Sequence, residues 1–271
     1  MYRGENLVLT DEDLKYNAPS IFATRPYHEV SDKYKFIPTI EVVNNLRQNN
    51  FFPVKASQSK ARLEGKREFT KHLIRFRQGK DLGVGQGKEV FELVLVNSHD
   101  RTSSYQLMLG IYRLVCANGL IIGDTLSKIR TIHRGQGNLV KDIIEASYGI
   151  IQDTPKIERK VNAWKGIELS PEKQLAFAKS ALELNPSSLE IQPNRILQAR
   201  RCEDKPNVEG NRNLWNTFNV IQENFIKGGS YGQNKKGKFR RTRAIKAVST
   251  DVKLNKALWT LTEEMEKILT K

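Results

Sequence analysis

Residues 89–96 read EVFELVLV, preceded by FTKHLIRFR at 69–77 and followed by YQLMLGIYRLVC at 105–116. Each run has the length of a β-strand and is rich in aliphatic and aromatic residues. The connections at 79–88 and 97–104 are rich in Gly, Asn, Ser and Asp, which favour turns. Three neighbouring strands joined by short connections predict an antiparallel meander.

The Asn118-Gly119 pair after the third run is typical of a two-residue hairpin turn, because both residue types tolerate the backbone conformation that such a turn needs. We therefore expect the chain to reverse there. It would then enter a fourth strand at residues 120–122, whose sequence is Leu-Ile-Ile.

The segments before the meander predict an irregular N-terminal region, one helix and the start of an extended segment. Residues 1–36 are polar and contain prolines that break helices. Apolar residues then recur with helical spacing over residues 40–46, with Thr39 as a candidate N-cap. The extended segment starts with FFPV at residues 51–54.

From residue 138 onward the apolar period is that of helices. Residues 139–164 predict a long amphipathic helix with an interruption near 153–155, and Ser170-Pro171 is typical of a helix start. The whole pattern predicts an α+β fold, in which an antiparallel β-meander packed with helices is followed by a mainly helical C-terminal half. The expected parts are an irregular segment at 1–36, an α+β core at 37–165 and a helical region at 166–271 with a basic loop at 228–246.

The positive charge of the chain is concentrated in two segments. The formal net charge is +15; residues 55–80 contribute +7 and residues 224–250 contribute +8. Charge gathered in this way indicates a polyanionic partner, most often the backbone of a nucleic acid. A basic protein without such a partner is the alternative interpretation.

The second basic segment carries the stronger signal for binding. Residues 228–243 (GGSYGQNKKGKFRRTR) contain few core-forming residues, so we expect a mobile basic loop. Cations can neutralise phosphates while an aromatic ring stacks on an unpaired base. The alternative is a solvated loop without a partner, although like charges this close repel one another unless something neutralises them. The candidate cations are Lys235, Lys236, Lys238, Arg240, Arg241 and Arg243, and the candidate stacking residues are Tyr231 and Phe239.

The first basic segment places cations beside and on a predicted strand. Alternation along that strand puts Arg75 and Arg77 on one face, while Lys66 and Arg67 precede the strand. A sheet face or groove lined by cations would suit a nucleic-acid backbone, so these four residues are further candidates. An ordinary solvent-facing strand is the alternative, because one-sided sheets normally expose polar residues.

Residues 97–100 (Asn-Ser-His-Asp) form the densest polar cluster. His99 and Asp100 could supply a general base or a metal ligand, as in a metal-dependent nuclease. No second carboxylate cluster stands at the spacing of a two-metal site. Because the same residue types are typical of turns, a structural turn is the favoured interpretation.

The sequence predicts neither a cofactor nor a membrane span. The glycine-rich stretch at 83–88 (GVGQGK) lacks the spacing of a phosphate-binding loop. The four His and two Cys residues have no zinc-ligand spacing. No apolar run reaches the roughly 18 residues of a membrane span, and the N-terminus lacks the apolar region of a secretory signal.

Residues 97–119 (NSHDRTSSYQLMLGIYRLVCANG) resemble the signature of a phage- and plasmid-encoded family, domain of unknown function 932. Three further segments resemble motifs of that family in order and spacing: 222–229 (QENFIKGG), 240–245 (RRTRAI) and 254–259 (LNKALW). Arg101 departs from the family pattern, in which a small residue, often Gly, follows the His-Asp pair.

This resemblance implies a mobile-element protein that works on or near DNA. The predicted helix, meander and long helix are also similar to the core of the single-strand annealing proteins, the Rad52-like and Red-beta-like recombinases. Those proteins form rings or filaments and hold single-stranded DNA in a basic groove.

We therefore expect a DNA-binding protein of a phage or plasmid, acting in the cytoplasm of the bacterial host and preferring single strands. The recombinase resemblance implies annealing activity and a homo-oligomer. The protein would need no nucleotide, no metal and no conventional catalytic site. Two alternatives stay open: a counter-defence protein whose basic surface recognises an acidic host protein, and a nuclease centred on His99 and Asp100.

Overall fold

The computed structural model describes residues 8–30, 36–61, 63, 65–83, 89–113, 118–122, 139–185, 187–199 and 212–271. The chain divides into two compact units. The first contains residues 1–114 and 119–153, and the second contains residues 154–271 with the short segment 115–118. The boundary predicted from the sequence fell after residue 165, whereas this division assigns residues 154–165 to the C-terminal half.

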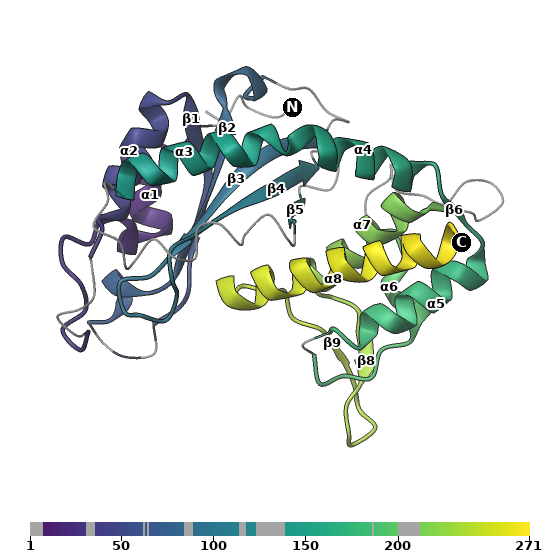
Figure 1. Ribbon diagram of the computed structural model, residues 1–271. Coiled ribbons are helices and arrows are strands. Elements are labelled where there is room, and N and C mark those ends of the chain that lie inside the picture. The colour runs from purple at the N-terminus through teal and green to yellow at the C-terminus, as the bar shows by residue number, and fades with distance from the viewer. Residues whose placement is uncertain are drawn as a thin grey trace. The chain divides into compact units, whose positions relative to one another are not determined.

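The first unit is built on a five-stranded sheet whose strands follow chain order (Figure 1). The pairings from β1 to β4 are antiparallel, so the predicted meander is confirmed. The strands are β1 (Phe51–Gln58), β2 (His72–Gln78), β3 (Glu89–Asn97), β4 (Gln106–Arg113) and β5 (Asn118–Ile121). Short 3-10 helices precede and follow β2, η2 at Arg67–Phe69 and η3 at Gly79–Asp81.

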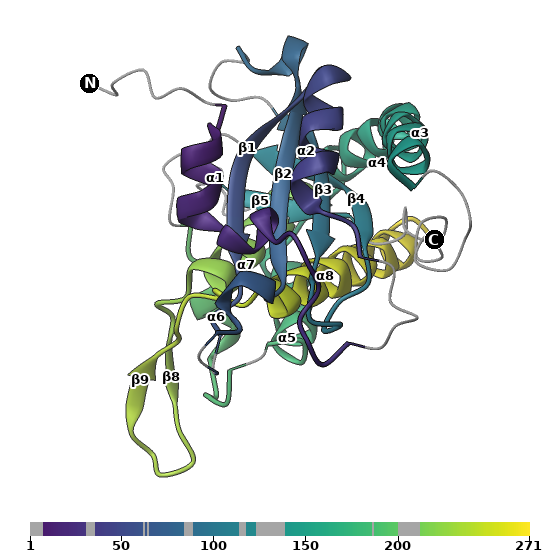
Figure 2. The ribbon, with the colours of Figure 1, turned by 90° about the vertical axis from the view of Figure 1, so that its left-hand side faces the viewer.

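Two helices, α2 (Thr39–Gln48) and α3 (Leu139–Gln152), cover one face of this sheet (Figure 2). Strand alternation turns Phe51 and Phe76 toward them, and both rings are fully buried. The ring of Tyr148 in α3 packs edge-on against Phe51, with 5.8 Å between the centroids. The aromatic and aliphatic residues of the quoted strands therefore form the core of this unit.

The residues before α2 are more regular than the sequence predicted. Helix α1 (Asp11–Asn17) begins with a capping box, in which Thr10 Oγ1 accepts from the backbone of Asp13 and the Asp13 carboxylate accepts from the backbone of Thr10. A 3-10 helix, η1 (Pro19–Phe22), follows. The prediction of an irregular segment was therefore wrong here, and the Thr-x-x-Asp spacing is the signal that indicates the helix.

The second unit is mainly helical, so the predicted α+β class is confirmed. Its core joins the three tryptophans of the chain: Trp164 and Trp259 have ring centroids 4.6 Å apart, and Trp215 stacks on Phe218 at 5.5 Å. The helices are α4 (Thr154–Lys165), α5 (Pro171–Leu182), α6 (Pro193–Ile196), α7 (Leu214–Lys227) and α8 (Val248–Leu269). Two short sheets pair β6 (Glu168–Leu169) with β7 (Arg212–Asn213) and β8 (Tyr231–Gln233) with β9 (Phe239–Arg241).

Two sequence signals for helix ends are confirmed. The long amphipathic pattern breaks at Asp153, between α3 and α4. Helix α5 has Pro171 in its first turn, and its N-cap Ser170 accepts from the backbone of Lys173. Of the helices in the described part of the chain, none is both long and apolar enough to cross a membrane.

The sheet face opposite α2 and α3 contains a buried ion-pair cluster. Glu92 of β3 accepts from Arg75 Nη1 at 3.0 Å and from Arg77 Nε at 2.7 Å. The three residues are 1%, 2% and 4% exposed, respectively. The expectation that Arg75 and Arg77 line a cationic sheet face or groove was therefore wrong, and so was the alternative of a solvent-facing strand. One carboxylate on the neighbouring strand draws both guanidinium groups inward, because a charge removed from water has to be paired.

Gly119 completes this cluster and does not form the predicted hairpin turn. Asn118 and Gly119 both lie in β5, and the Gly119 carbonyl accepts from Arg75 Nη2 at 2.8 Å. A Cβ atom at Gly119 would lie 2.4 Å from Arg75 Cζ, so a side chain there would displace the guanidinium. The glycine therefore provides space for a buried arginine.

Replacing Glu92 by Gln is expected to destabilise the protein by about 3–5 kcal/mol, because two guanidinium groups would stay buried without their counter-charge. Urea unfolding followed by circular dichroism measures this loss. Glu29→Gln, at an exposed acid of the same unit, is the matched control.

The combined variant Arg75→Met, Arg77→Met and Glu92→Leu removes all three charges and is expected to regain most of the lost stability. A Glu92→Gln protein within about 0.5 kcal/mol of the Glu29→Gln control would contradict this account of the cluster.

Candidate nucleic-acid interface

Eight of the twelve predicted contact residues lie on or beside one hairpin of the second unit, formed by β8 and β9 (Figure 2). The sequence predicted a mobile loop here. The structure instead pairs Tyr231 with Arg241, Gly232 with Arg240 and Gln233 with Phe239. We call this element, residues 228–243, the basic hairpin. Its backbone pairing fixes which side chains share a face.

The turn of the basic hairpin is organised by Asn234. Its side-chain oxygen accepts from the backbone N–H groups of Lys236 and Lys238, each at 3.0 Å. Gly237 adopts a positive φ of 75°, which favours glycine, and its N–H donates to the Asn234 carbonyl at 2.8 Å. Lys235, Lys236 and Lys238 are thus presented from an ordered turn, and all three are exposed.

The base of the basic hairpin is tied to its own unit. Gly229 N donates to Thr242 O at 2.8 Å, and Thr242 N donates to Ser230 O at 2.9 Å. On the other edge of β8, Gln233 exchanges two backbone hydrogen bonds with Glu190, at 2.8 and 2.9 Å. The hairpin is therefore held along both edges of β8.

One face of the basic hairpin is open and aromatic. Paired residues share a face, and successive residues alternate, so Tyr231, Phe239 and Arg241 lie on the same side. Tyr231 is 45% exposed and Phe239 is 68% exposed. The Arg241 guanidinium carbon lies 4.6 Å from the centroid of the Tyr231 ring, a cation–π arrangement. This face offers two aromatic surfaces and a planar cation to a partner.

The cations of the basic hairpin are exposed and lack an acidic partner within the described residues. No described carboxylate lies within 4.0 Å of any of the six side chains predicted to bind phosphate. Their mutual repulsion is therefore not relieved by a described ion pair, which favours binding of a polyanion. The six are Lys235, Lys236, Lys238, Arg240, Arg241 and Arg243.

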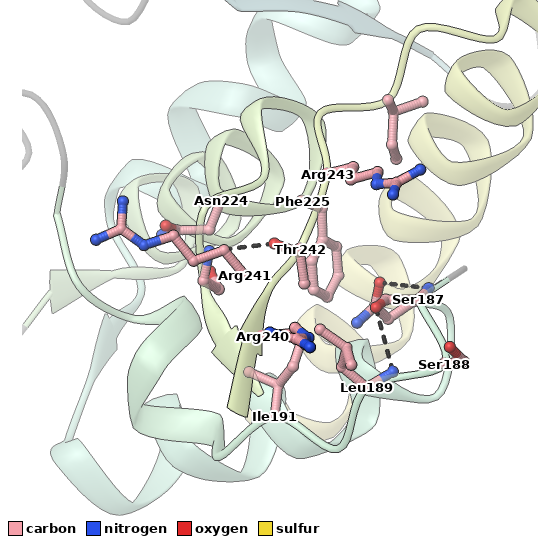
Figure 3. Close-up of a pocket in the computed structure, with 13 residues that line it drawn as sticks. Ser187, Ser188, Leu189, Ile191, Asn224, Phe225, Arg240, Arg241, Thr242 and Arg243 are labelled. Atoms are coloured by element: carbon pink, nitrogen blue, oxygen red, sulfur yellow. Dashed lines mark hydrogen bonds between the residues drawn. The ribbon is translucent and has the colours of Figure 1, made fainter. Parts of the chain in front are cut away.

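The other face of the basic hairpin borders a cavity of about 510 Å³ (Figure 3). Gly232 packs so closely on residues 189–191 that a Cβ atom would lie 2.8 Å from the Glu190 carbonyl oxygen. Its pairing partner Arg240 lines the cavity together with Arg241 and Arg243, and in Figure 3 the Arg241 side chain points away from that of Arg240. The hairpin thus presents two different surfaces.

Asn185, Ser187, Ser188, Leu189 and Ile191 line this cavity and were not among the residues predicted from the sequence. Asn185 Oδ1 accepts from Ser187 N at 3.1 Å, and Ser187 Oγ accepts from Leu189 N at 3.2 Å. The Asn-Pro-Ser-Ser sequence indicates such a turn. Nothing in that sequence indicates that the turn meets β8, because the contact joins residues about forty positions apart.

The four predicted contact residues of the first unit do not form a cationic surface with one another. Arg75 and Arg77 are buried on Glu92. The Lys66 ammonium lies 3.7 Å from the Asp100 carboxylate and 5.0 Å from the centroid of the Tyr27 ring. Arg67 is exposed, at the start of η2. Of these four, Arg67 is exposed, Lys66 is part-exposed, and Arg75 and Arg77 are buried.

The Asn97–Asp100 cluster is a buried structural turn. The His99 side chain is fully buried, its backbone N–H donates to Phe69 O at 2.9 Å, and its carbonyl accepts from Tyr27 N at 2.9 Å. Asp100 Oδ1 accepts from both the N–H and the hydroxyl of Thr102, at 3.1 and 2.6 Å. Across the described residues, no group of three or more His, Cys, Asp or Glu side chains could hold a metal ion. These observations give a nuclease site no support.

A buried polar network links this turn to α2 and β2. Thr39 Oγ1 lies 3.0 Å from His72 Nε2 and 3.2 Å from His99 Nε2, and it accepts from Asn97 Nδ2 at 3.1 Å. His72 Nδ1 lies 2.8 Å from Ser20 Oγ. The expectation that Thr39 is the N-cap of α2 was wrong, because the helix begins at Thr39 and its N-cap is Pro38. Burial, together with the neighbouring His99, lowers the pKa of His72 to about 3.

Three sequence segments that resembled family motifs, 222–229, 240–245 and 254–259, contact one another in the second unit. Gln222 of α7 donates to Asn255 of α8 at 2.8 Å. Ile245 N donates to Ile226 O at 2.9 Å, where the chain leaves the hairpin. Gly228 adopts a positive φ of 63°, and a Cβ atom there would lie 2.5 Å from the Arg243 backbone. These motif residues hold the base of the hairpin in place.

Comparison with known proteins confirms the family resemblance. The family model "Domain of unknown function (DUF932)" matches residues 26–259, and the chain belongs to that family. Two similar proteins of Escherichia coli (strain K12) are the UPF0380 proteins YafZ and YfjQ. Each is 39% identical over 259 residues, which cover 95% of this chain and 91% of the relative. No solved structure matches the chain.

The glycine-rich residues 84–88 lie outside the described residues.

The low pKa of His72 predicts a pH-dependent stability. The unfolded chain binds a proton at His72 below its ordinary pKa of 6.5, whereas the folded chain does so only near pH 3. The contribution of neutral His72 to the free energy of unfolding is therefore fully present above pH 6.5. It decreases as the pH falls from 6.5 toward 3. Between pH 7 and pH 5, the loss is expected to be about 2 kcal/mol.

Urea unfolding at the two pH values measures this loss. His72→Gln, which can still hydrogen-bond to Ser20 and Thr39, should show a drop smaller by about that amount. The same pH dependence in both proteins would exclude His72 as the titrating group.

Arg101 adopts a positive φ of 64°, which explains physically why a small residue, often Gly, is expected after the His-Asp pair. Arg101→Gly is expected to stabilise the protein by about 1 kcal/mol, because glycine adopts this conformation without steric cost. Urea unfolding at pH 7 is the measurement, and Arg101→Ala, which keeps a Cβ atom, is the control. Equal stability of the two variants would contradict the inference that a residue with a Cβ atom is strained at position 101.

Proposed function

We propose that this protein binds nucleic acid, with a preference for single-stranded DNA, through the basic hairpin. One observation carries the proposal: the open face combines two exposed aromatic rings with Arg241, next to a turn that bears three exposed lysines. Cations of this kind neutralise phosphates, and aromatic rings stack on bases. The face thus matches both chemical parts of a polynucleotide.

The exposed rings favour a single strand over a duplex. Phe239 and Tyr231 project from a narrow two-stranded element, so their ring surfaces are available for stacking. In a duplex the base faces are already stacked on one another, and the protein meets mainly phosphates and base edges. An unpaired strand offers its base faces without sequence restriction.

The family resemblance supports a more specific setting for this activity. We propose a role on phage or plasmid DNA in the bacterial cytoplasm, including single-strand annealing by a homo-oligomer, with no requirement for nucleotide or metal. The support is the motif pattern and the basic hairpin. Annealing of complementary labelled strands, with particle size followed by light scattering, tests this part separately from binding.

Removing the three arginines of the hairpin, Arg240→Ala, Arg241→Ala and Arg243→Ala together, is expected to weaken binding of a labelled single-stranded oligonucleotide. The slope of log K against log salt should also fall, by roughly 0.7 for each phosphate of the single strand that the variant no longer neutralises. Fluorescence anisotropy across a salt series measures both quantities, with a duplex of the same length in parallel.

The matched control removes three exposed cations elsewhere in the second unit: Arg159, Lys173 and Lys179, each replaced by Ala. Its net charge equals that of the hairpin variant, so any difference in affinity reports position rather than total charge. Equal reductions of affinity in both variants would mean that the protein binds the oligonucleotide through its overall positive charge and not through the hairpin. Unchanged affinity in the hairpin variant would remove the hairpin from the interface, and an acidic host protein would become the partner to test.

A further inference from the structure

The cavity beside the basic hairpin has a cationic wall. Arg240 and Arg243 both reach it, and none of the thirteen lining residues, all of them described, is acidic. In Figure 3 the Arg240 guanidinium lies near Leu189 and Ser187, whereas the Arg243 guanidinium lies apart from it at another part of the lining. A guanidinium group binds phosphate through two parallel N–H donors, so this wall is suited to an anionic oxygen group.

Hydroxyl groups add donors to this wall. Ser187 Oγ accepts from Leu189 N at 3.2 Å, and Thr242 Oγ1 accepts from Ser230 N at 3.1 Å. Because each oxygen already accepts a backbone N–H, its own O–H can donate to a ligand. The cavity therefore offers hydroxyl donors in addition to guanidinium groups.

The remaining wall is apolar. Phe225 of α7 is almost completely buried and contributes its ring, and Leu189 and Ile245 extend the surface. An inorganic anion would leave this wall uncovered, whereas a sugar with its base would cover it. A cavity of about 510 Å³ also lies within the size range of small-molecule sites, roughly 300–1,000 Å³. The ligand it fits has one phosphate and one nucleoside.

We propose that this cavity binds the terminal nucleotide of a DNA strand through its end phosphate. This inference rests on the proposed function and names the part of the strand that the second face of the hairpin would hold. A terminal phosphate carries nearly two negative charges at neutral pH, against one for a phosphate within the strand. Two arginines without an acid therefore favour the end of the strand over its interior.

The test uses the full chain and one oligonucleotide sequence in three forms: with a 5′-phosphate, with a 3′-phosphate and with hydroxyl groups at both ends. The expected result is that one phosphorylated form binds about tenfold more tightly than the unphosphorylated form, from added charge-assisted hydrogen bonds. Thymidine monophosphate is added as a competitor to distinguish a strand end from a free nucleotide.

The readout is the affinity ratio between phosphorylated and unphosphorylated strands, which general loss of charge leaves unchanged. Ser188→Glu places a carboxylate in the cavity lining and should bring the ratio to one. Ser180→Glu adds the same charge at an exposed position of α5 and should keep the ratio. Tyr231→Ala with Phe239→Ala should weaken all strands alike and also keep the ratio.

Each result decides between the proposals. Equal binding of all three strands would overturn the terminal-phosphate site and leave the proposed function intact. Thymidine monophosphate binding as tightly as a phosphorylated strand would assign the cavity to free nucleotides and overturn the strand-end proposal. No binding of any oligonucleotide or of the mononucleotide would overturn both the proposed function and the site.

Discussion

The carboxylate of Glu92 is the constraint on which the first unit depends. It lies on β3, and it holds two arginines of β2 at hydrogen-bond distance inside the sheet. Arg75 in turn donates to the backbone of β5, so one buried charge connects three strands. A slip of one residue between β2 and β3 would turn Glu92 and the two arginines toward opposite faces of the sheet and so separate the charges. The cluster therefore fixes the register of the meander.

The buried arginines also change how the charge of the sequence is understood. The two basic segments carry almost equal net charge, yet the structure uses them differently. In the first, Arg75 and Arg77 are internal, and Lys66 is engaged with Asp100 and Tyr27. In the second, the hairpin cations face solvent. Charge density along a sequence thus locates candidates, and burial decides which of them can meet a partner.

The order of elements could be predicted from the sequence because it depends on local pattern. Apolar runs indicated the strands β2 to β4, and Ser170-Pro171 indicated the start of α5. One error, at α1, was a local capping signal that the prediction missed, and others involved contacts between distant residues. Position 119 is a glycine because the guanidinium of Arg75, 44 positions away in the sequence, leaves no space for a side chain there. The sequence around Gly119 does not indicate this contact. The pairing of β8 with Glu190, which shapes the cavity, is of the same kind.

The turn of the basic hairpin, residues 234–238, is closed by its own hydrogen bonds and lies beyond the backbone bonds that tie β8 to Glu190 and Gly229 to Thr242. Changes of length in such a turn leave the packing of α7 against α8 untouched. The turn is therefore a module that related proteins can lengthen or shorten independently of the core. It is also the place where a fluorescent reporter could be inserted into this protein with little risk to folding.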